Sequence, residues 1–375
     1  MGRGFRVLVA LAAALVVMFS IGDAHARPQR QTAPLAARGP STARARLIAE
    51  VRRGLDLAAA RWGWKGWFVK RRGTARWAPI WDSVHLLSAA TGLAAASGRA
   101  DDKLRAADLA RRAEGYWNPR LAGGIGGFST QFATQGDSSP NWFDDNGWLG
   151  LAFFSAYEQT GDPAFLRDAR RALTYINRAG WDKRDGGIWW STEHGFKAGE
   201  SVVTAALLAV RLYHATGDPA HLMAARRLID WANVHLFDFD AGLYVNRPDG
   251  APISYLQSPM IDAMARLCRS RQLYCDRLQF LVEASLRRYG GTLTHAPKYD
   301  GMYLRFLVDA HEVLHDKRLL RVVFHNALRA EKLAAVGDGF FTHDWSGSNQ
   351  ETEAGSLQTH AATLQALAWA AVVLP

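Results

Sequence analysis

Two adjacent carboxylic acids, Asp144 and Asp145, stand between aromatic residues in the sequence. Apolar residues recur at helical spacing in the segment that follows, residues 149–157. Pro140 and Asn141, just upstream, are typical of the start of a helix. We therefore expect both acids in or just before a first helical turn, where free backbone N–H groups and the helix dipole favour carboxylates.

The spacing of these two acids suits a particular chemistry. Adjacent helical residues point about 100° apart, so the two carboxylates could straddle a bound ligand. A separation of roughly 5 Å is that of a retaining glycosidase, whereas an inverting pair needs roughly 6.5–9.5 Å. An isolated Asp-Asp pair usually only caps a helix. Here Trp142, Phe143 and Trp148 flank both acids, which would be a poor environment for a solvated cap.

The N-terminus has the pattern of a secretory signal peptide. Basic residues precede an apolar run, residues 7–21, and a small-residue cleavage site follows at residues 24–26. We predict a signal peptide over residues 1–26 and a disordered linker, rich in Pro, Ala, Arg and Gln, over residues 27–43. No later stretch is long and apolar enough to span a membrane. A secreted or periplasmic location is expected.

The remainder of the chain carries an internal repeat of about 55 residues. The segment 157–164, Tyr-x-x-Thr-Gly-Asp-Pro-Ala, recurs at 213–220, and each copy precedes a helical run and a Gly-aromatic segment. Each unit combines a helix that is apolar all round with a one-sided, Arg-rich helix, which places the first kind inside and the second outside. Six units predict an all-α, (α/α)6 toroid of six inner and six outer helices in a single domain, residues 44–375.

The predicted inner helices begin near residues 80, 145, 199, 257, 301 and 355, and the predicted outer helices cover 43–61, 102–117, 164–179, 220–235, 276–289 and 317–332. All long loops then lie at the N-terminal ends of the inner helices. Function concentrates on loops held by a rigid scaffold, so a central cleft at this end, containing Asp144 and Asp145, is expected.

The net charge of +10 and the cysteine content limit the possible partners. Basic residues are scattered over helix patterns and no nucleic-acid motif is present, although a basic protein could bind an acidic glycan.

Cys268 and Cys275 flank an expected helix–helix turn, and a disulfide between them is plausible in a secreted chain. The histidines have no metal-binding spacing. We expect no metal, no cofactor and a monomer.

Several segments resemble glycoside hydrolase family 76. These are residues 142–146, 186–190, 298–301 with 305–307, and 344–347, and the resemblance extends from about residue 44 to the end of the chain. It implies an (α/α)6 barrel and an endo-α-1,6-mannanase that retains anomeric configuration. It also implies that Asp144 is the nucleophile and Asp145 the general acid/base. In the segment 255–258, where the family has an Asn-Gln-Gly-like element, only Gln257 fits.

Further residues are candidates for binding the sugar. Asn146 could hold a carboxylate by hydrogen bonding or serve the start of the helix. Asp82, Glu200 and Asp300 lie near inner-helix starts and could bind hydroxyl groups, although capping is the simpler role. Aromatic rings at the long-loop end could stack on pyranose faces or merely fill the barrel mouth. The expected substrate-binding residues are Trp142, Asn146, Trp189, Trp190, Gln257, Tyr299 and Trp345.

Two other functions fit the same sequence. One is a different enzyme on the same toroid, such as a lyase or hydrolase acting on a uronate-containing glycan, which the basic charge favours. The other is a non-catalytic carbohydrate-binding protein, which would keep the aromatic residues but would not need both acids. A polysaccharide or oligosaccharide is the expected partner in each case.

Overall fold

The computed structural model describes residues 42–134, 140–336, 339–342, 345–346 and 355–375. The predicted signal peptide, residues 1–26, lies outside the described residues, as does all of the predicted linker except its last two residues. Among the described residues, no helix is both long enough and apolar enough to cross a bilayer.

Twelve long helices of the described residues fall into two sets. The inner helices are α2 (Ile80–Ser97), α5 (Phe143–Thr160), α7 (Gly199–Thr216), α9 (Ser254–Leu267), α11 (Pro297–Leu314) and α13 (Leu357–Val373). The outer helices are α1 (Thr42–Trp62), α3 (Ala100–Ala113), α6 (Pro163–Tyr175), α8 (Pro219–His235), α10 (Gln272–Tyr289) and α12 (Lys317–Leu333).

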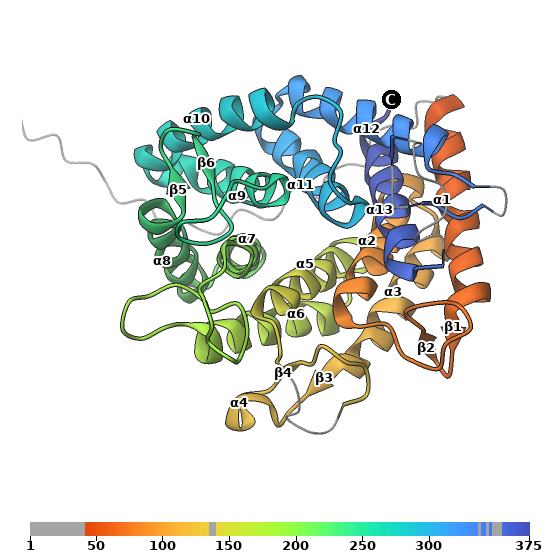
Figure 1. Cartoon of the computed structure of the whole chain (residues 1–375), viewed down its shortest axis with the longest axis horizontal. Helices are drawn as coiled ribbons and strands as arrows, with labels where there is room; N and C mark the ends of the chain where they lie inside the picture. Colours follow the sequence, from red (N-terminus) through yellow and green to blue (C-terminus); the bar gives the residue numbers. More distant parts are fainter. Residues whose placement is uncertain (1–41, 135–139, 337–338, 343–344, 347–354) are drawn as a thin grey trace, which may run out of the picture. The chain divides into compact units, whose positions relative to one another are not determined.

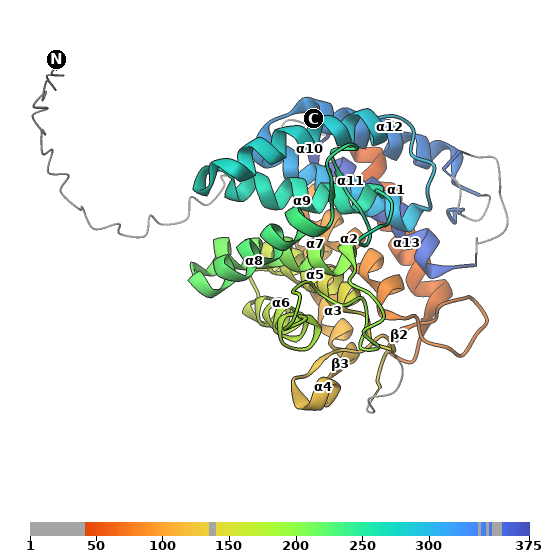
Figure 2. The same cartoon turned by 60° about the vertical axis from the view of Figure 1, so that its left-hand side comes forward.

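The inner helices form a closed ring. Each packs against the next in chain order, and α13 packs against α2 to complete the circle. Figures 1 and 2 show the consequence: the orange helix α2 lies beside the dark-blue helix α13, although they come from opposite ends of the described chain. The outer helices cover this ring, so the predicted (α/α)6 toroid is confirmed.

Burial separates the two sets as the hydrophobic pattern predicts. In α13 almost every residue from Leu357 to Ala371 is buried, so the helix has no face for solvent. In α12 the buried residues recur every three or four positions, as in Leu319, Val322 and Val323, and form one stripe. A helix that is apolar all round must lie inside other helices, and a striped one covers them.

The recurring Thr-Gly-Asp-Pro turn joins an inner helix to the next outer one. Gly161 ends α5 with φ +71°, in the left-handed region that favours glycine. Asp162 then caps α6 by accepting a hydrogen bond of 2.9 Å from the backbone N–H two residues on, and proline occupies the first helical position. Gly217 and Asp218 repeat this arrangement between α7 and α8.

Short hairpins and turns occupy the loops before the inner helices. The hairpins pair β1 (Gly63–Trp64) with β2 (Trp67–Phe68), β3 (Trp117–Asn118) with β4 (Gly127–Phe128), and β5 (Phe237–Asp238) with β6 (Leu243–Tyr244). The remaining short elements are η1 (Glu114–Tyr116), α4 (Leu121–Gly124), η2 (Ile176–Gly180), which is a π-helix turn, and η3 (Cys268–Ser270).

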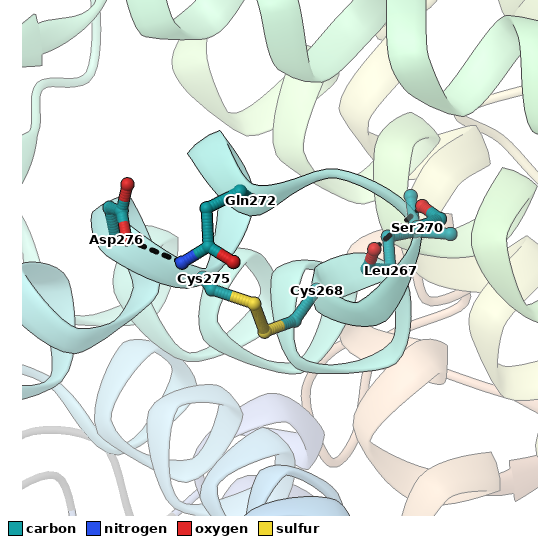
Figure 3. The surroundings of a disulfide bond; sticks show 6 residues. All are labelled: Leu267, Cys268, Ser270, Gln272, Cys275 and Asp276. Atoms are coloured by element: carbon teal, nitrogen blue, oxygen red, sulfur yellow. Dashed lines mark hydrogen bonds between the residues drawn. A yellow bond between two sulfur atoms is a disulfide. The ribbon is translucent and has the colours of Figure 1, made fainter. Parts of the chain in front are cut away.

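A disulfide joins Cys268 and Cys275 across the turn between α9 and α10, with their Cα atoms 4.6 Å apart (Figure 3). Cys268 opens the single turn η3, and Cys275 lies in the first turn of α10. Ser270 donates a hydrogen bond of 2.6 Å to the carbonyl of Leu267 within the same turn. The disulfide therefore closes a short local loop far along the chain from Asp144.

A buried ion cluster ties three inner helices together near their C-terminal ends. Arg211 of α7 pairs with Asp262 of α9, at 2.6 Å, and with Asp309 of α11. Arg266 pairs with Asp262 at 2.7 Å, and Arg305 pairs with Asp309. Burial alone would raise the pKa of Asp309, but the charges of Arg211 and Arg305 outweigh it and hold that pKa below its ordinary value.

Substitution of Arg211 should test the importance of this cluster. Arg211→Met leaves Asp262 and Asp309 buried without their shared cation, and should lower the free energy of unfolding by about 3–5 kcal/mol in urea titrations. Arg271→Met is the control, because Arg271 and Asp230 form an exposed pair at 2.7 Å. Its loss should cost less than about 1 kcal/mol. Equal losses in both variants would contradict a structural role for the cluster.

Candidate active site

A cavity of about 530 Å³ opens at the N-terminal ends of inner helices α2, α5, α7, α9 and α11. Three carboxylates line it, those of Asp144, Asp145 and Glu200. Seven aromatic side chains also line it: Trp81, Trp142, Trp148, Trp190, Phe196, Tyr255 and Tyr299. This combination of acids and flat apolar rings suits a sugar, whose ring faces are apolar and whose edges carry hydroxyl groups.

Asp144 and Asp145 are both in the first turn of α5. The backbone N–H of Phe143 donates to the carbonyl of Trp190 at 2.9 Å, which fixes the entry into the helix against the following long loop. Asp145 is almost completely buried, with 8% of its surface exposed, whereas Asp144 is more open to the cavity. The two adjacent acids on one helical turn therefore differ in how deeply their side chains are buried.

The surroundings favour the protonated form of both acids. Burial raises the pKa of Asp144 to about 8, and the charge of Glu200 adds to the effect, while hydrogen bonds from backbone N–H groups and from the Trp190 indole oppose it. Burial, followed by the charges of Asp144 and Asp82, raises the pKa of Asp145 well above its ordinary value. One proton can thus be held at neutral pH in a place where a reaction could use it.

Glu200 lies in the first turn of α7 and is the third acid of the cavity. Its Oε1 accepts a hydrogen bond of 2.9 Å from the hydroxyl of Tyr255, and burial raises its pKa. Tyr255 stacks on Tyr299 with ring centroids 4.8 Å apart. The sequence offered one signal for Glu200, its place in the first turn of an inner helix like that of Asp144.

The predicted aromatic platforms divide into two groups. Trp142, Trp190 and Tyr299 line the cavity. Trp189 does not: its ring stacks on His194, with centroids 5.2 Å apart, away from the carboxylates. Neighbouring residues of an extended segment point to opposite sides, so only one of the two adjacent tryptophans can face the cavity.

Trp345 is also outside the cavity lining, contrary to expectation. It is 4% exposed and donates from its indole N–H to the hydroxyl of Thr363 on α13, at 2.9 Å. Its ring therefore packs into the core beneath the loop. Asp344 and Gly347, which belong to the segment of resemblance around it, lie outside the described residues.

Asn146 and Gln257 are loop anchors, and the structure corrects the expectation that they bind substrate. Asn146 accepts from the N–H of Phe128, at 2.8 Å, and donates to its carbonyl, at 2.9 Å. Gln257 makes the same pair of hydrogen bonds with Tyr244, at 2.9 and 2.8 Å. Both side chains are fully buried, so their amides are engaged in pinning a hairpin to an inner helix.

Other cavity residues escaped sequence analysis as binding candidates. Trp81 and Trp148 have ring centroids 5.8 Å apart, and Trp148 lies 6.0 Å from the ring of Tyr255, so the three continue the stack that Tyr299 begins. They come from three different inner helices, and nothing in their local spacing indicates that they meet. Within the described residues, no group of three or more His, Cys, Asp or Glu side chains could hold a metal ion.

Comparison with known families finds one similarity, over the segment that carries the paired acids. The model of glycosyl hydrolase family 76 matches residues 126–251, the segment that contains Asp144, Asp145 and Glu200. Over this segment the chain is similar to the family that the sequence motifs resemble. A comparison with curated proteins finds no match.

Solved structures support the fold. The family 76 α-mannanase of Bacteroides thetaiotaomicron is 19% identical, with a TM-score of 0.78 over 87% of this chain and 95% of that one. An inactive variant of the α-1,6-mannanase of Salegentibacter sp. HEL1_6, bound to α-1,6-mannotriose, is 17% identical, with a TM-score of 0.68 over 88% and 99% of the two chains. Dfg5 from Chaetomium thermophilum, in complex with glucosamine, is 15% identical, with a TM-score of 0.68 over 87% and 90%.

The anchoring role of Asn146 can be tested by removing its amide. Asn146→Ala leaves the N–H and the carbonyl of Phe128 buried without their partner. The expected loss is about 2–4 kcal/mol of unfolding free energy, measured by urea denaturation. Asn177→Ala is the control, because Asn177 accepts an exposed hydrogen bond from Arg227, and it should change stability by less than about 1 kcal/mol. A loss no greater than that of the control would contradict the anchor.

The raised pKa of Asp144 predicts a pH-dependent change in stability. The folded protein holds a proton to about pH 8 that the unfolded chain releases near its ordinary pKa of 3.8. This carboxyl group therefore reduces stability progressively as the pH rises from about 4 to about 8. Asp144→Asn lacks the charge, so its melting temperature should exceed that of the wild type by roughly 2 °C or more at pH 8, and by less at pH 5.

Differential scanning fluorimetry in buffers of matched ionic strength measures this difference. Asp240→Asn, at an exposed position, serves as the control. A gain from Asp144→Asn that is the same at both pH values would show that the folded protein does not retain this proton.

Proposed function

We propose that this protein is a glycoside hydrolase that cleaves α-1,6-mannosidic linkages in mannan-type polysaccharide, with retention of anomeric configuration. The observation that carries the proposal is the pair of adjacent, buried aspartates, Asp144 and Asp145, in a cavity lined by aromatic rings. Two solved relatives support the choice of linkage. They are inactive variants of an α-1,6-mannanase, each with two adjacent aspartates replaced, bound to α-1,6-mannotriose and to the tetrose.

In the proposed mechanism the two acids divide the work. Asp145 lies deeper and retains its proton, so it protonates the leaving glycosidic oxygen. Asp144 attacks the anomeric carbon in its ionised form, whose share grows as the pH approaches the raised pKa of about 8. The carbon–oxygen bond to the leaving sugar breaks as the bond to Asp144 forms. Asp145, now ionised, then removes a proton from water, and this water displaces the Asp144 carboxylate to release the sugar.

Esterification also changes the electrostatics of the pair. Asp144 is one of the charges that raise the pKa of Asp145. When Asp144 forms the covalent bond its charge disappears, the pKa of Asp145 falls, and Asp145 can act as a base. Glu200 remains beside the pair, held by Tyr255, where it can accept a hydrogen bond from a sugar hydroxyl.

The proposal extends to the setting of the enzyme. It comprises one catalytic domain, residues 44–375, acting as a monomer outside the cytoplasm after removal of the signal peptide, residues 1–26. The long loops at one end of the ring suit a polymeric glycan as partner.

A non-catalytic binding role receives less support. Burying two adjacent carboxylic acids without a paired cation is costly, and binding a neutral sugar does not require it. A binding protein could use the same aromatic rings with neutral side chains in place of Asp144 and Asp145.

Two variants separate the roles of the acids. Asp144→Asn should reduce hydrolysis of α-1,6-mannan at least about 10³-fold, because no covalent intermediate can form. Asp145→Asn should lose activity similarly on mannan, yet should release the phenol of a dinitrophenyl α-1,6-mannobioside in a rapid burst. That leaving group needs no proton, so only the second step is slow. Product chromatography and stopped-flow absorbance measure the two effects.

Asp240→Asn, an exposed change of the same kind, is the control and should keep full activity. Proton NMR of the first product formed by the wild type should show the α-anomer. An initial β-anomer would exclude retention, and full activity of Asp144→Asn would remove that residue from the chemistry. Wild-type protein that binds mannan without cleaving it would favour the binding role.

A further inference from the structure

The loop between α1 and α2, residues 63–79, is strongly basic. It contains Lys65, Lys70, Arg71, Arg72 and Arg76 and no acidic residue. A solvated helix face of this protein usually mixes the two signs, as the many Arg–Asp pairs on its outer helices show. A loop of one sign beside the cavity therefore needs another explanation.

Two of these cations face the cavity that contains the paired aspartates. Lys70 and Arg76 both line it. They are neighbours across a narrow loop, because the backbone N–H of Lys70 donates to the carbonyl of Arg76 at 3.0 Å, and Val69 pairs with Trp77 beside them. The two positive side chains thus enter the cavity wall together.

The backbone beneath these two cations is held in place. The carbonyl of Lys70 accepts a hydrogen bond of 3.1 Å from the N–H of Leu357, at the start of α13. On the other arm, the N–H of Ala78 donates to the carbonyl of Phe68 at 2.8 Å. Trp64 packs on Trp77, with centroids 5.0 Å apart. A fixed backbone reduces the entropy lost when the side chains bind a ligand.

A third cation comes from a different part of the ring. Lys298 lies in the first turn of α11 and lines the same cavity, with its ammonium group 5.0 Å from the centroid of the Tyr299 ring. Lys298 is half-buried, unlike Lys70 and Arg76, which are exposed. Segments more than 200 residues apart thus contribute positive charge to one cavity.

The three cations have no ion-pair partner among the described residues. Among the described residues, no ion pair includes Lys70, Arg76 or Lys298. The carboxylates of the cavity are not neutralised by them either, since the pKa of Asp144 is raised. As far as the described part of the chain is concerned, the positive charge is therefore available to a ligand.

We infer that Lys70, Arg76 and Lys298 form a subsite for an anionic substituent, a phosphate or a carboxylate, carried by the glycan that the cavity binds. This inference rests on the proposed function and narrows its substrate class from mannan in general to an acid-substituted mannan. The guanidinium of Arg76 can hold two oxygens of such a group at once, and the lysines supply compact charges around it. A neutral mannan offers these three side chains no counterpart.

Steady-state kinetics on matched substrates tests the subsite. One mannan oligosaccharide is compared in three forms: bearing a phosphate, bearing a uronic acid, and neutral after removal of the phosphate. With the anionic form that fits, the double variant Lys70→Gln/Arg76→Gln and the single variant Lys298→Gln should each raise KM by about tenfold or more, with kcat little changed. With the neutral form, KM should change less than about twofold.

Lys103→Gln is the matched control, because Lys103 is an exposed cation on outer helix α3, away from the cavity. It should leave all three KM values unchanged. The preference of the wild type for the anionic form should also weaken as salt is raised from about 0.05 to 0.5 M, because exposed charges are screened over about 10 Å at 0.1 M.

The three forms also identify the source of the charge. A KM effect confined to the phosphate form assigns the subsite to phosphate, and one confined to the uronate form assigns it to carboxylate. Equal KM values for charged and neutral forms in the wild type, or equal effects of the cavity variants and Lys103→Gln, would overturn the inference.

A binding measurement separates this inference from the proposed function. Isothermal titration calorimetry follows the same oligosaccharides binding to Asp144→Asn, with and without the Lys70→Gln/Arg76→Gln pair. In one outcome the wild type hydrolyses none of the oligosaccharides, yet the anionic form binds at least tenfold more tightly than the neutral one. If the Lys70→Gln/Arg76→Gln variant loses this difference in affinity, the hydrolase proposal fails while the subsite stands. If neutral mannan is cleaved and no margin exists, the subsite fails while the hydrolase proposal stands.

Discussion

Burying a carboxylate costs free energy unless a cation accompanies it. Over the part of the chain that the structure describes, the inner helices bury carboxylates with cations at one end and without them at the other. Near the C-terminal ends, Asp262 and Asp309 share Arg211, and the ion cluster fastens α7, α9 and α11 together. Near the N-terminal ends, no cation of the described residues forms an ion pair with Asp144 or Asp145, and burial raises the pKa values of both acids. The buried charges at the C-terminal ends hold the helices together, whereas the acids at the N-terminal ends can hold a proton that a reaction could use.

The ring makes the uncompensated end possible. Because α13 packs against α2, the ring closes, and residues near the N-terminal ends of α2, α5, α7, α9 and α11 line one cavity. Aromatic rings from three of these helices pack beside one another next to the acids. The hairpins before these helices are held by buried amides, Asn146 in one repeat and Gln257 in another. Asn146 and Gln257 therefore fix the walls of the cavity, although neither side chain lines it.

The repeat explains why so much of the fold follows from sequence. The Thr-Gly-Asp-Pro turn combines a left-handed glycine, a capping aspartate and a proline suited to the first helical turn, so each residue type has a local cause. Apolar periodicity placed the twelve long helices of the described residues within a few positions of their observed starts, for example 199 for α7 and 145 instead of 143 for α5. The largest errors fall at both kinds of helix end, at the starts of α10 and α11 and at the C-terminal ends of α3 and α6, where loop packing decides the terminal turn.

The sequence by itself determined the ring of paired helices and the place of Asp144 and Asp145 at its mouth, because helix periodicity, caps and an adjacent pair of acids are local properties. Only the tertiary structure decided which side chains share the cavity. Trp190 lines the cavity and the adjacent Trp189 does not, while the amides of Asn146 and Gln257 bind hairpins. Lys70 and Arg76 line the same cavity as Lys298, which lies more than 200 residues further along the chain. The physical reason is that the direction of a side chain and its hydrogen-bond partners depend on neighbours that ring closure brings together. Local sequence spacing does not predict these neighbours.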